Sequence, residues 1–273
     1  MKKIKYLILS FLSVLALTGF LPQVSAEEVK HEFSVGPYAS YIKYEEPDVM
    51  EETGFMAGVF ADYSAHYTQG IVFGADGTLS AGQVDYDSVS TGSIDGIDDF
   101  MGEVRGSVGY DIAMSGETRA TPYVGFGYRF LRDETGGMIS TTGAAGYDRE
   151  TEYLYVPVGI KTMSNLNSDW KFGFNIEYDV FIDGTQKSEL GDVVAGVDTL
   201  ENDQDDGYGV RGSIKLVKTG EKYSILVEPF IRYWNIEDSD LQSVSIGGTP
   251  IGIVGIEPEN NSFEAGFKVG FNY

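Results

Sequence analysis

The C-terminal segment, from Ser262 to Tyr273, alternates between apolar and polar side chains. The apolar positions are Phe263, Ala265, Phe267, Val269, Phe271 and Tyr273. The positions between them hold Ser, Glu, Gly, Lys or Asn. A repeat of two is that of a β-strand, in which successive side chains point to opposite faces. The segment is therefore predicted to form a strand with one apolar and one polar face.

Similar patterning recurs along the chain in ten segments. They are Glu32–Tyr44, Glu52–Ala65, Gly70–Gln83, Asp99–Ile112, Ala120–Arg132, Arg149–Met163, Asp169–Asp183, Gly207–Lys218, Lys222–Ile236 and Ser262–Tyr273. Each is about as long as a tilted strand must be to cross the apolar layer of a bilayer. We predict an all-β fold, a transmembrane antiparallel up-and-down β-barrel of ten strands, with eight or twelve strands as the alternatives.

The links between these segments alternate in length. Residues 66–69, 113–119, 164–168 and 219–221 form short links, whereas 45–51, 84–98, 133–148, 184–206 and 237–261 are mostly long. Outer-membrane barrels have short turns in the periplasm and longer loops outside the cell. The five long links also hold 23 Asp and Glu residues against a single basic residue, Lys187. We therefore predict short periplasmic turns and long acidic extracellular loops.

The polar faces of the strands carry charges of both signs. The predicted lumen network comprises Glu103, Arg105, Asp111, Arg129, Lys171, Glu177, Asp179, Arg211, Lys215, Glu228, Arg232, Glu264 and Lys268. Adding Asp62, Asp76 and Lys161 gives eight inward bases and eight inward acids. A barrel of about ten strands is narrow, and paired Arg and carboxylate side chains would brace and occlude it. The alternative is a thin, ion-selective pore.

The N-terminus has the features of an export signal. Lys2, Lys3 and Lys5 precede an apolar stretch, and Val24-Ser25-Ala26 is a small-residue cleavage site. The predicted domains are thus a signal peptide at 1–26 and a barrel at 27–273. The mature chain has 16 Lys and Arg against 42 Asp and Glu, a net charge of −26 that excludes nucleic acid as a partner. Cysteine is absent, which excludes disulfides and thiolate metal sites.

Candidate chemistry is sparse. The chain has two histidines, His31 and His66, and both map to the periplasmic end of the predicted barrel. Omptin proteases and barrel lipid hydrolases use a histidine in the outer half of the barrel, so the sequence predicts no catalytic site of that type. The densest acidic cluster is Glu201, Asp203, Asp205 and Asp206, which lacks the spacing of an EF-hand loop and is a weak cation candidate. No cofactor is expected.

Export signal, amphipathic strands, alternating loops and aromatic terminus together resemble small bacterial outer-membrane β-barrel proteins of the outer-membrane-protein-A-like and opacity-like type. The resemblance covers essentially Glu32 to Tyr273. It implies the outer membrane of a Gram-negative bacterium, with lipid and lipopolysaccharide as neighbours and divalent cations as possible partners. It also implies insertion by the outer-membrane assembly machinery, with Phe271 to Tyr273 as the recognition element. Two functions are compatible with these features: a non-catalytic structural or surface-interaction barrel, or a small cation-favouring porin.

Overall fold

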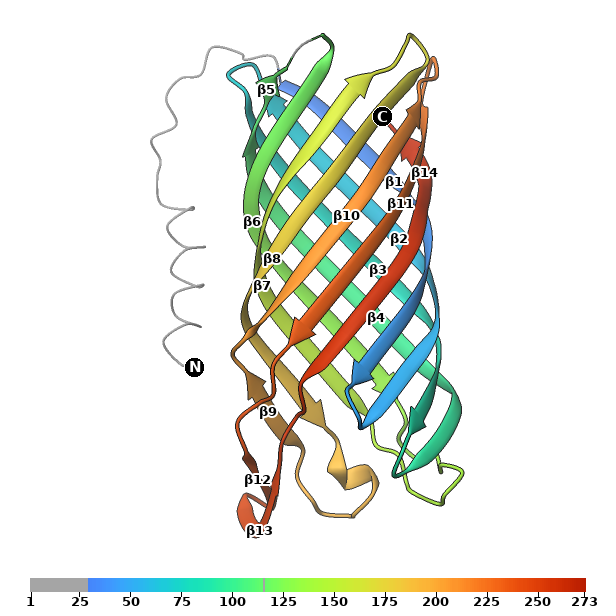
Figure 1. Ribbon diagram of the computed structural model, residues 1–273, viewed down its shortest axis with the longest axis vertical. Helices are drawn as coiled ribbons and strands as arrows, with labels where there is room; N and C mark the ends of the chain where they lie inside the picture. The colour runs from blue at the N-terminus through green and yellow to red at the C-terminus, as the bar shows by residue number, and fades with distance from the viewer. Residues whose placement is uncertain (1–28, 115) are drawn as a thin grey trace.

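All ten predicted segments form strands in the computed structural model, and these strands pair into a closed antiparallel wall. The wall strands are β1 (Val29–Glu46), β2 (Met50–Tyr67), β3 (Ile71–Ser88), β4 (Gly92–Tyr110), β6 (Thr118–Glu134), β7 (Arg149–Asn165), β8 (Trp170–Ser188), β10 (Gly207–Lys218), β11 (Ser224–Ile236) and β14 (Asn260–Asn272). Chain neighbours pair in order, β14 pairs with both β1 and β11, and β8 pairs with β10. The barrel is therefore the predicted up-and-down one (Figure 1).

The structure describes residues 29–114 and 116–273, so the predicted export signal at 1–26 lies outside the described residues. Small elements sit between the wall strands: β5 (Ile112–Ala113), η1 (Leu190–Asp192), β9 (Leu200–Gln204), β12 (Gln242–Ile246) and β13 (Thr249–Gly255). In this described part of the chain, no helix has the length and apolar character needed to cross a membrane.

The two ends of the barrel differ. Links 68–70, 111–117, 166–169 and 219–223 form what we call the short-turn end, and β9 with the β12–β13 hairpin projects from the opposite, long-link end (Figure 1). Two of the links predicted to be long, 45–51 and 84–98, are short turns. Residues 47–49 join β1 to β2, and residues 89–91 join β3 to β4. Strand pairing continues there beyond the apolar band, so the acidic residues of these links belong largely to strands.

The pleat places apolar side chains on the outside of the wall. On β6, Val124, Phe126 and Tyr128 are exposed, while Tyr123 and Arg129 on the other face are buried. On β8 the alternation changes where its register with β7 shifts, between Leu154 and Tyr155: the buried positions are odd-numbered up to Phe181 and even-numbered from Gly184, as a β-bulge produces. The outer surface is thus an apolar band, and the interior contains the charged and aromatic side chains.

The lumen also contains apolar side chains. Near the long-link end lies a cluster of Ile42, Met56, Val84, Ile94, Ile97 and Met101. Aromatic rings and an isoleucine form a second cluster of Tyr153, Tyr155, Phe181, Trp234 and Ile236. A third cluster comprises Tyr38, Phe60, Val217, Leu226 and Phe230. The lumen is therefore filled partly by hydrophobic packing, which the sequence pattern did not predict.

Candidate functional site: the charged lumen

Arg211 on β10 is the centre of the lumen network. It makes a forked pair with Glu103 on β4, with Nη1 to Oε2 at 2.8 Å and Nη2 to Oε1 at 2.7 Å. Its Nε donates to Asp179 Oδ2 on β8 at 2.5 Å. Strands β6, β7 and β8 separate β4 from β10 in the wall, so this pair crosses the lumen. Two parallel N–H···O contacts give the crossing a fixed geometry.

Tyr155 completes the centre of this group. Its hydroxyl donates to Glu103 Oε1 at 2.6 Å and accepts from Arg211 Nη2 at 2.8 Å. The Arg211 guanidinium also lies 5.1 Å from the centre of the Tyr155 ring. All three side chains are buried. Because buried charges must be paired and hydrogen-bonded to be tolerated, these contacts hold the ions inside the wall.

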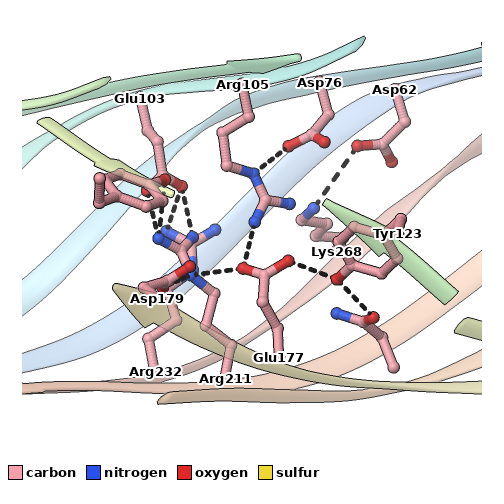
Figure 2. A network of polar contacts seen from close by, with 12 residues as sticks. Asp62, Asp76, Glu103, Arg105, Tyr123, Glu177, Asp179, Arg211, Arg232 and Lys268 are labelled. Carbon is pink, nitrogen blue, oxygen red and sulfur yellow. Dashed lines mark hydrogen bonds and ion pairs between the residues drawn. The ribbon is translucent and has the colours of Figure 1, made fainter. Parts of the chain in front are cut away.

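Further ion pairs extend the network, and Figure 2 shows those that join Glu177 to Arg105 and Arg105 to Asp76. Arg232 Nη1 lies 3.2 Å from Glu264 Oε2 and 3.5 Å from Glu103 Oε2. Glu177 Oε1 lies 2.6 Å from Arg105 Nη1 and 3.0 Å from Arg211 Nε. We call the connected group of Asp76, Glu103, Arg105, Tyr155, Glu177, Asp179, Arg211, Arg232 and Glu264 the ionic plug.

Arg105 on β4 connects the ionic plug to β3 and β8 inside the lumen. Its Nε donates to Asp76 Oδ2 on β3 at 2.6 Å, while Nη1 reaches Glu177 on β8. Glu177 also accepts a hydrogen bond from the hydroxyl of Tyr123 on β6. The plug thus joins strands from opposite halves of the barrel, and its side chains bridge the lumen in two places.

The remaining predicted lumen residues lie outside the plug. Arg129 is buried beyond it toward the long-link end, with Nη2 3.4 Å from the Met101 sulfur and its guanidinium 5.9 Å from the Trp234 ring centre. Toward the short-turn end, two weaker pairs join Lys215 to Glu228 at 3.4 Å and Lys268 to Asp62 at 3.8 Å. Lys171 makes no ion pair with any described residue, and Asp111 lies at the short-turn end.

Asp111 takes part in a hydrogen-bonded series that the sequence reasoning missed. Ser64 Oγ lies 3.0 Å from His66 Nε2, and His66 Nδ1 lies 2.7 Å from Asp111 Oδ2. The order is that of a Ser-His-Asp relay. Ser64, however, lies within a strand paired on both sides, with Glu32 on β1 and Gly74 on β3, so its backbone N–H belongs to the sheet. A relay also needs donors for an oxyanion, and these backbone groups do not supply them.

A second buried cluster anchors the long-link end. Arg149 Nη2 lies 2.8 Å from Glu46 Oε1 and 2.6 Å from Glu257 Oε1. The Tyr44 hydroxyl lies 3.1 Å from each of these two oxygens and can donate to either. Burial raises the pKa of Glu257, which lies in the link after β13, while the nearby Arg149 guanidinium opposes the rise. Glu257 thereby ties the link that follows the β12–β13 hairpin to the wall.

The acidic residues proposed for cation binding lie in and after β9. Glu201 and Asp203 share one face of β9, and Asn202 and Gln204 are buried on the other. Asp205 and Asp206 follow and are exposed. Across residues 29–114 and 116–273, no three His, Asp or Glu side chains are arranged to hold a metal ion. The acidic cluster stays a weak cation candidate.

Comparison with solved structures agrees with this architecture. The chain is similar to the outer-membrane protease OmpT of Escherichia coli, with a TM-score of 0.66 and 12% identity over 92% of this chain and 99% of that chain. It is also similar to the translocator domain of the autotransporter NalP from Neisseria meningitidis, with a TM-score of 0.43 and 11% identity over 100% and 97% of the two chains. The outer membrane protein OprG of Pseudomonas aeruginosa matches with a TM-score of 0.38 and 8% identity, over 89% of this chain and 94% of that chain. At 12% identity the likeness to OmpT concerns the fold alone.

Sequence comparison assigns the family. A search against curated proteins finds no significant match. The family described as "Outer membrane protein beta-barrel domain" matches residues 12–198, more than half of the chain. The short-turn end is accordingly the periplasmic end, and the long-link end is extracellular. The chain belongs to this outer-membrane β-barrel family and is a protein of the bacterial outer membrane.

Proposed function

We propose that this protein is a closed, non-catalytic barrel that acts through its extracellular surface. The observation that carries the proposal is the forked pair between Glu103 and Arg211, which spans the lumen and is held by Asp179 and Tyr155. A conducting pore needs a continuous aqueous path, and buried ion pairs across a narrow barrel occupy that path. Charge in this lumen therefore serves to brace the wall.

The packing beyond the ionic plug supports the same conclusion. Trp234 and Tyr155 are almost wholly buried, and their rings meet at 5.0 Å in an edge-to-face arrangement. Arg129 connects Trp234 with the apolar cluster of Ile97 and Met101, because its guanidinium lies near both the Trp234 ring and the Met101 sulfur. An ion moving through the barrel would have to pass both an ionic and an apolar barrier.

The extracellular links supply the surface for interaction. Their exposed acids include Asp192, Glu201, Asp205, Asp206, Glu237, Asp238 and Asp240. The β12–β13 hairpin exposes Ile246, Ile251, Ile253 and Val254 beside them. Carboxylates and lipopolysaccharide phosphates are both hard oxygen ligands, so divalent cations can bridge them. We propose that the links contact the lipopolysaccharide layer in this way, and replacing Glu201, Asp205 and Asp206 with Asn should weaken cation-dependent binding to lipopolysaccharide vesicles.

Planar-bilayer recording tests the closed lumen. Folded wild-type protein, verified by its heat-modifiable gel mobility, should give no reproducible conductance steps. A variant with Glu103→Ala, Arg105→Ala, Arg211→Ala and Arg232→Ala should give small steps, because both ionic crossings of the lumen are removed. The matched control is Lys43→Ala with Glu51→Ala, an exposed ion pair of 2.9 Å at the extracellular rim. Steps from the wild-type barrel would favour the competing function, a small cation-favouring porin.

Labelling of Ser64 tests the non-catalytic part of the proposal. A fluorophosphonate reacts with a serine that a histidine activates. We expect no labelling of the folded protein, because the Ser64 position lacks a backbone oxyanion site. Labelling that is lost in His66→Gln would contradict this part and would establish a hydrolytic centre at the periplasmic end.

A further inference from the structure

The periplasmic end of the lumen contains a cavity of about 180 Å³. This is on the order of ten times the ~10–15 Å³ that one water molecule needs. Glu32, His66 and Asn272 of the periplasmic rim belong to its lining, and Arg105 of the ionic plug closes its inner end. The cavity is therefore a dead end that is reached from the periplasm.

The charges that line this cavity do not balance. Four acids face it, and each has a basic partner in the lining: Asp76 with Arg105, Glu32 with Arg119, Glu228 with Lys215, and Asp62 with Lys268. Two further bases, Lys161 and Lys171, line the cavity without an acidic partner among the described residues. The lining thus holds six bases against four acids. Glu177 and Asp111, just outside the lining, give Arg105 and Arg119 a second acidic partner, so Lys161 and Lys171 are the lining bases that form no ion pair with a described residue.

The surroundings of the two lysines suit a small anion. Lys161 on β7 is exposed to the cavity and lies 4.7 Å from the ring centre of Tyr123. Its partner across the β7–β8 pair is Asn175, and Lys171 lies four positions from Asn175 on β8, about 13 Å along the strand. Both ammonium groups stand on flexible four-carbon stems and can turn toward one bound group. Hydroxyl and amide groups of Ser107, Thr162, Asn175 and Ser213 also line the space.

We propose that this periplasmic cavity, which we call the lysine vestibule, binds a small divalent oxyanion of the phosphate type between Lys161 and Lys171. Lysine binds such groups as a point charge with three donors. The low-dielectric wall concentrates the field of the two ammonium groups within the cavity, as charged clefts do. The acidic extracellular surface repels the same anions, so the protein selects anions only from the periplasmic side.

Titration of folded protein with inorganic phosphate tests the proposal. The protein is kept in a sugar-headgroup detergent, which carries no phosphate, with chloride in fixed excess. We expect one saturable site. Lys161→Gln and Lys171→Gln should each weaken binding about tenfold or more, the factor for loss of a charged hydrogen bond. Lys222→Gln is the matched control, because it removes the same charge from the periplasmic turn 219–223 outside the cavity lining.

A second measurement on wild-type protein does not depend on the folding of variants. The rate of acetylation of each lysine is measured by mass spectrometry. Phosphate should slow the acetylation of Lys161 and Lys171 and should leave the rate at Lys222 unchanged. The proposal is overturned if folded wild-type protein shows no saturable phosphate binding. It is also overturned if both Gln variants bind as the wild type does, or if phosphate protects Lys222 as strongly as the two vestibule lysines.

Discussion

Replacing Arg211 with methionine should destabilise the folded barrel strongly, although the new side chain has a similar length. Arg211 is 6% exposed, and its partners Glu103 and Asp179 are 3% and 0% exposed. Removing the guanidinium leaves both carboxylates buried without their main counter-ion. Breaking a buried ion pair by removing one partner costs about 3–5 kcal/mol, and we expect a loss in this range for Arg211→Met.

The control is an ion pair of similar distance at the surface. Lys43 lies 3.0 Å from Glu45 and 2.9 Å from Glu51, with all three side chains at least 36% exposed. Exposed pairs contribute about 0–1 kcal/mol, so Lys43→Met should cost little. A double variant, Arg211→Met with Glu103→Gln, also neutralises one of the two carboxylates that lose their counter-ion. It should be less destabilised than the sum of the single variants by about 1–3 kcal/mol.

The assay is urea unfolding in lipid vesicles, with the folded fraction measured on unheated gels and by circular dichroism. Tryptophan fluorescence is avoided here, since Arg211 lies 5.6 Å from the Trp234 ring centre and its loss would change the signal directly. Equal costs for Arg211→Met and Lys43→Met, or strict additivity in the double variant, would refute the reasoning that the ionic plug is desolvated and coupled.

Three further outcomes follow from other parts of the barrel. Phe126→Arg on the lipid-facing surface should cost about 2–4 kcal/mol in vesicles, whereas Val89→Arg in the extracellular turn should cost almost nothing, as urea unfolding will measure. Gly127→Val should cost about 1–3 kcal/mol through overpacking, because a side chain at this position overlaps the Tyr155 ring. Gly106→Val is the control, since a side chain there meets open space. An equal loss of stability for both variants would contradict the packing. Since the pKa of Glu257 is raised on folding, its contribution to stability is present below its ordinary pKa and falls as the pH rises toward the raised value. Glu257→Gln should flatten the pH dependence of the unfolding free energy in that window, and an unchanged profile would contradict the shift.

The strand pattern was sufficient to predict the wall, because lipid on one side and ions on the other impose a repeat of two on every crossing. It was insufficient where that contrast ends. Between Val84 and Asp98 the pattern is reversed: Val84, Ile94 and Ile97 are buried inside the barrel. The outward positions hold Asp85, Asp87 and Asp95, so the strand pairing up to Ser88 and from Gly92 shows no apolar outer face. The link predicted to be long is a turn of residues 89–91.

The contacts inside the lumen could be predicted only in kind. The alternation indicates that Glu103 and Arg211 point inward, but their meeting across 108 positions of sequence depends on the curvature of the closed wall. The same limit applies to Arg129. The alternation predicts that it points inward, but not that its guanidinium lies near the Trp234 ring rather than beside an acid. Register shifts cannot be predicted from alternation alone. One example is the shift between Val84 and Tyr86, which lies near the inward Ile94 and Ile97.

Selective quenching of the two tryptophans tests most directly whether the apolar face contacts lipid and the charged face is enclosed. Trp170 is 39% exposed on the outer wall, and Trp234 is 1% exposed within the lumen. In vesicles of lipids brominated on their acyl chains, Trp234→Phe protein, which retains Trp170, should be strongly quenched. Trp170→Phe protein, which retains Trp234, should be quenched little. The reverse result, with Trp234 quenched by lipid and Trp170 protected, would contradict the account.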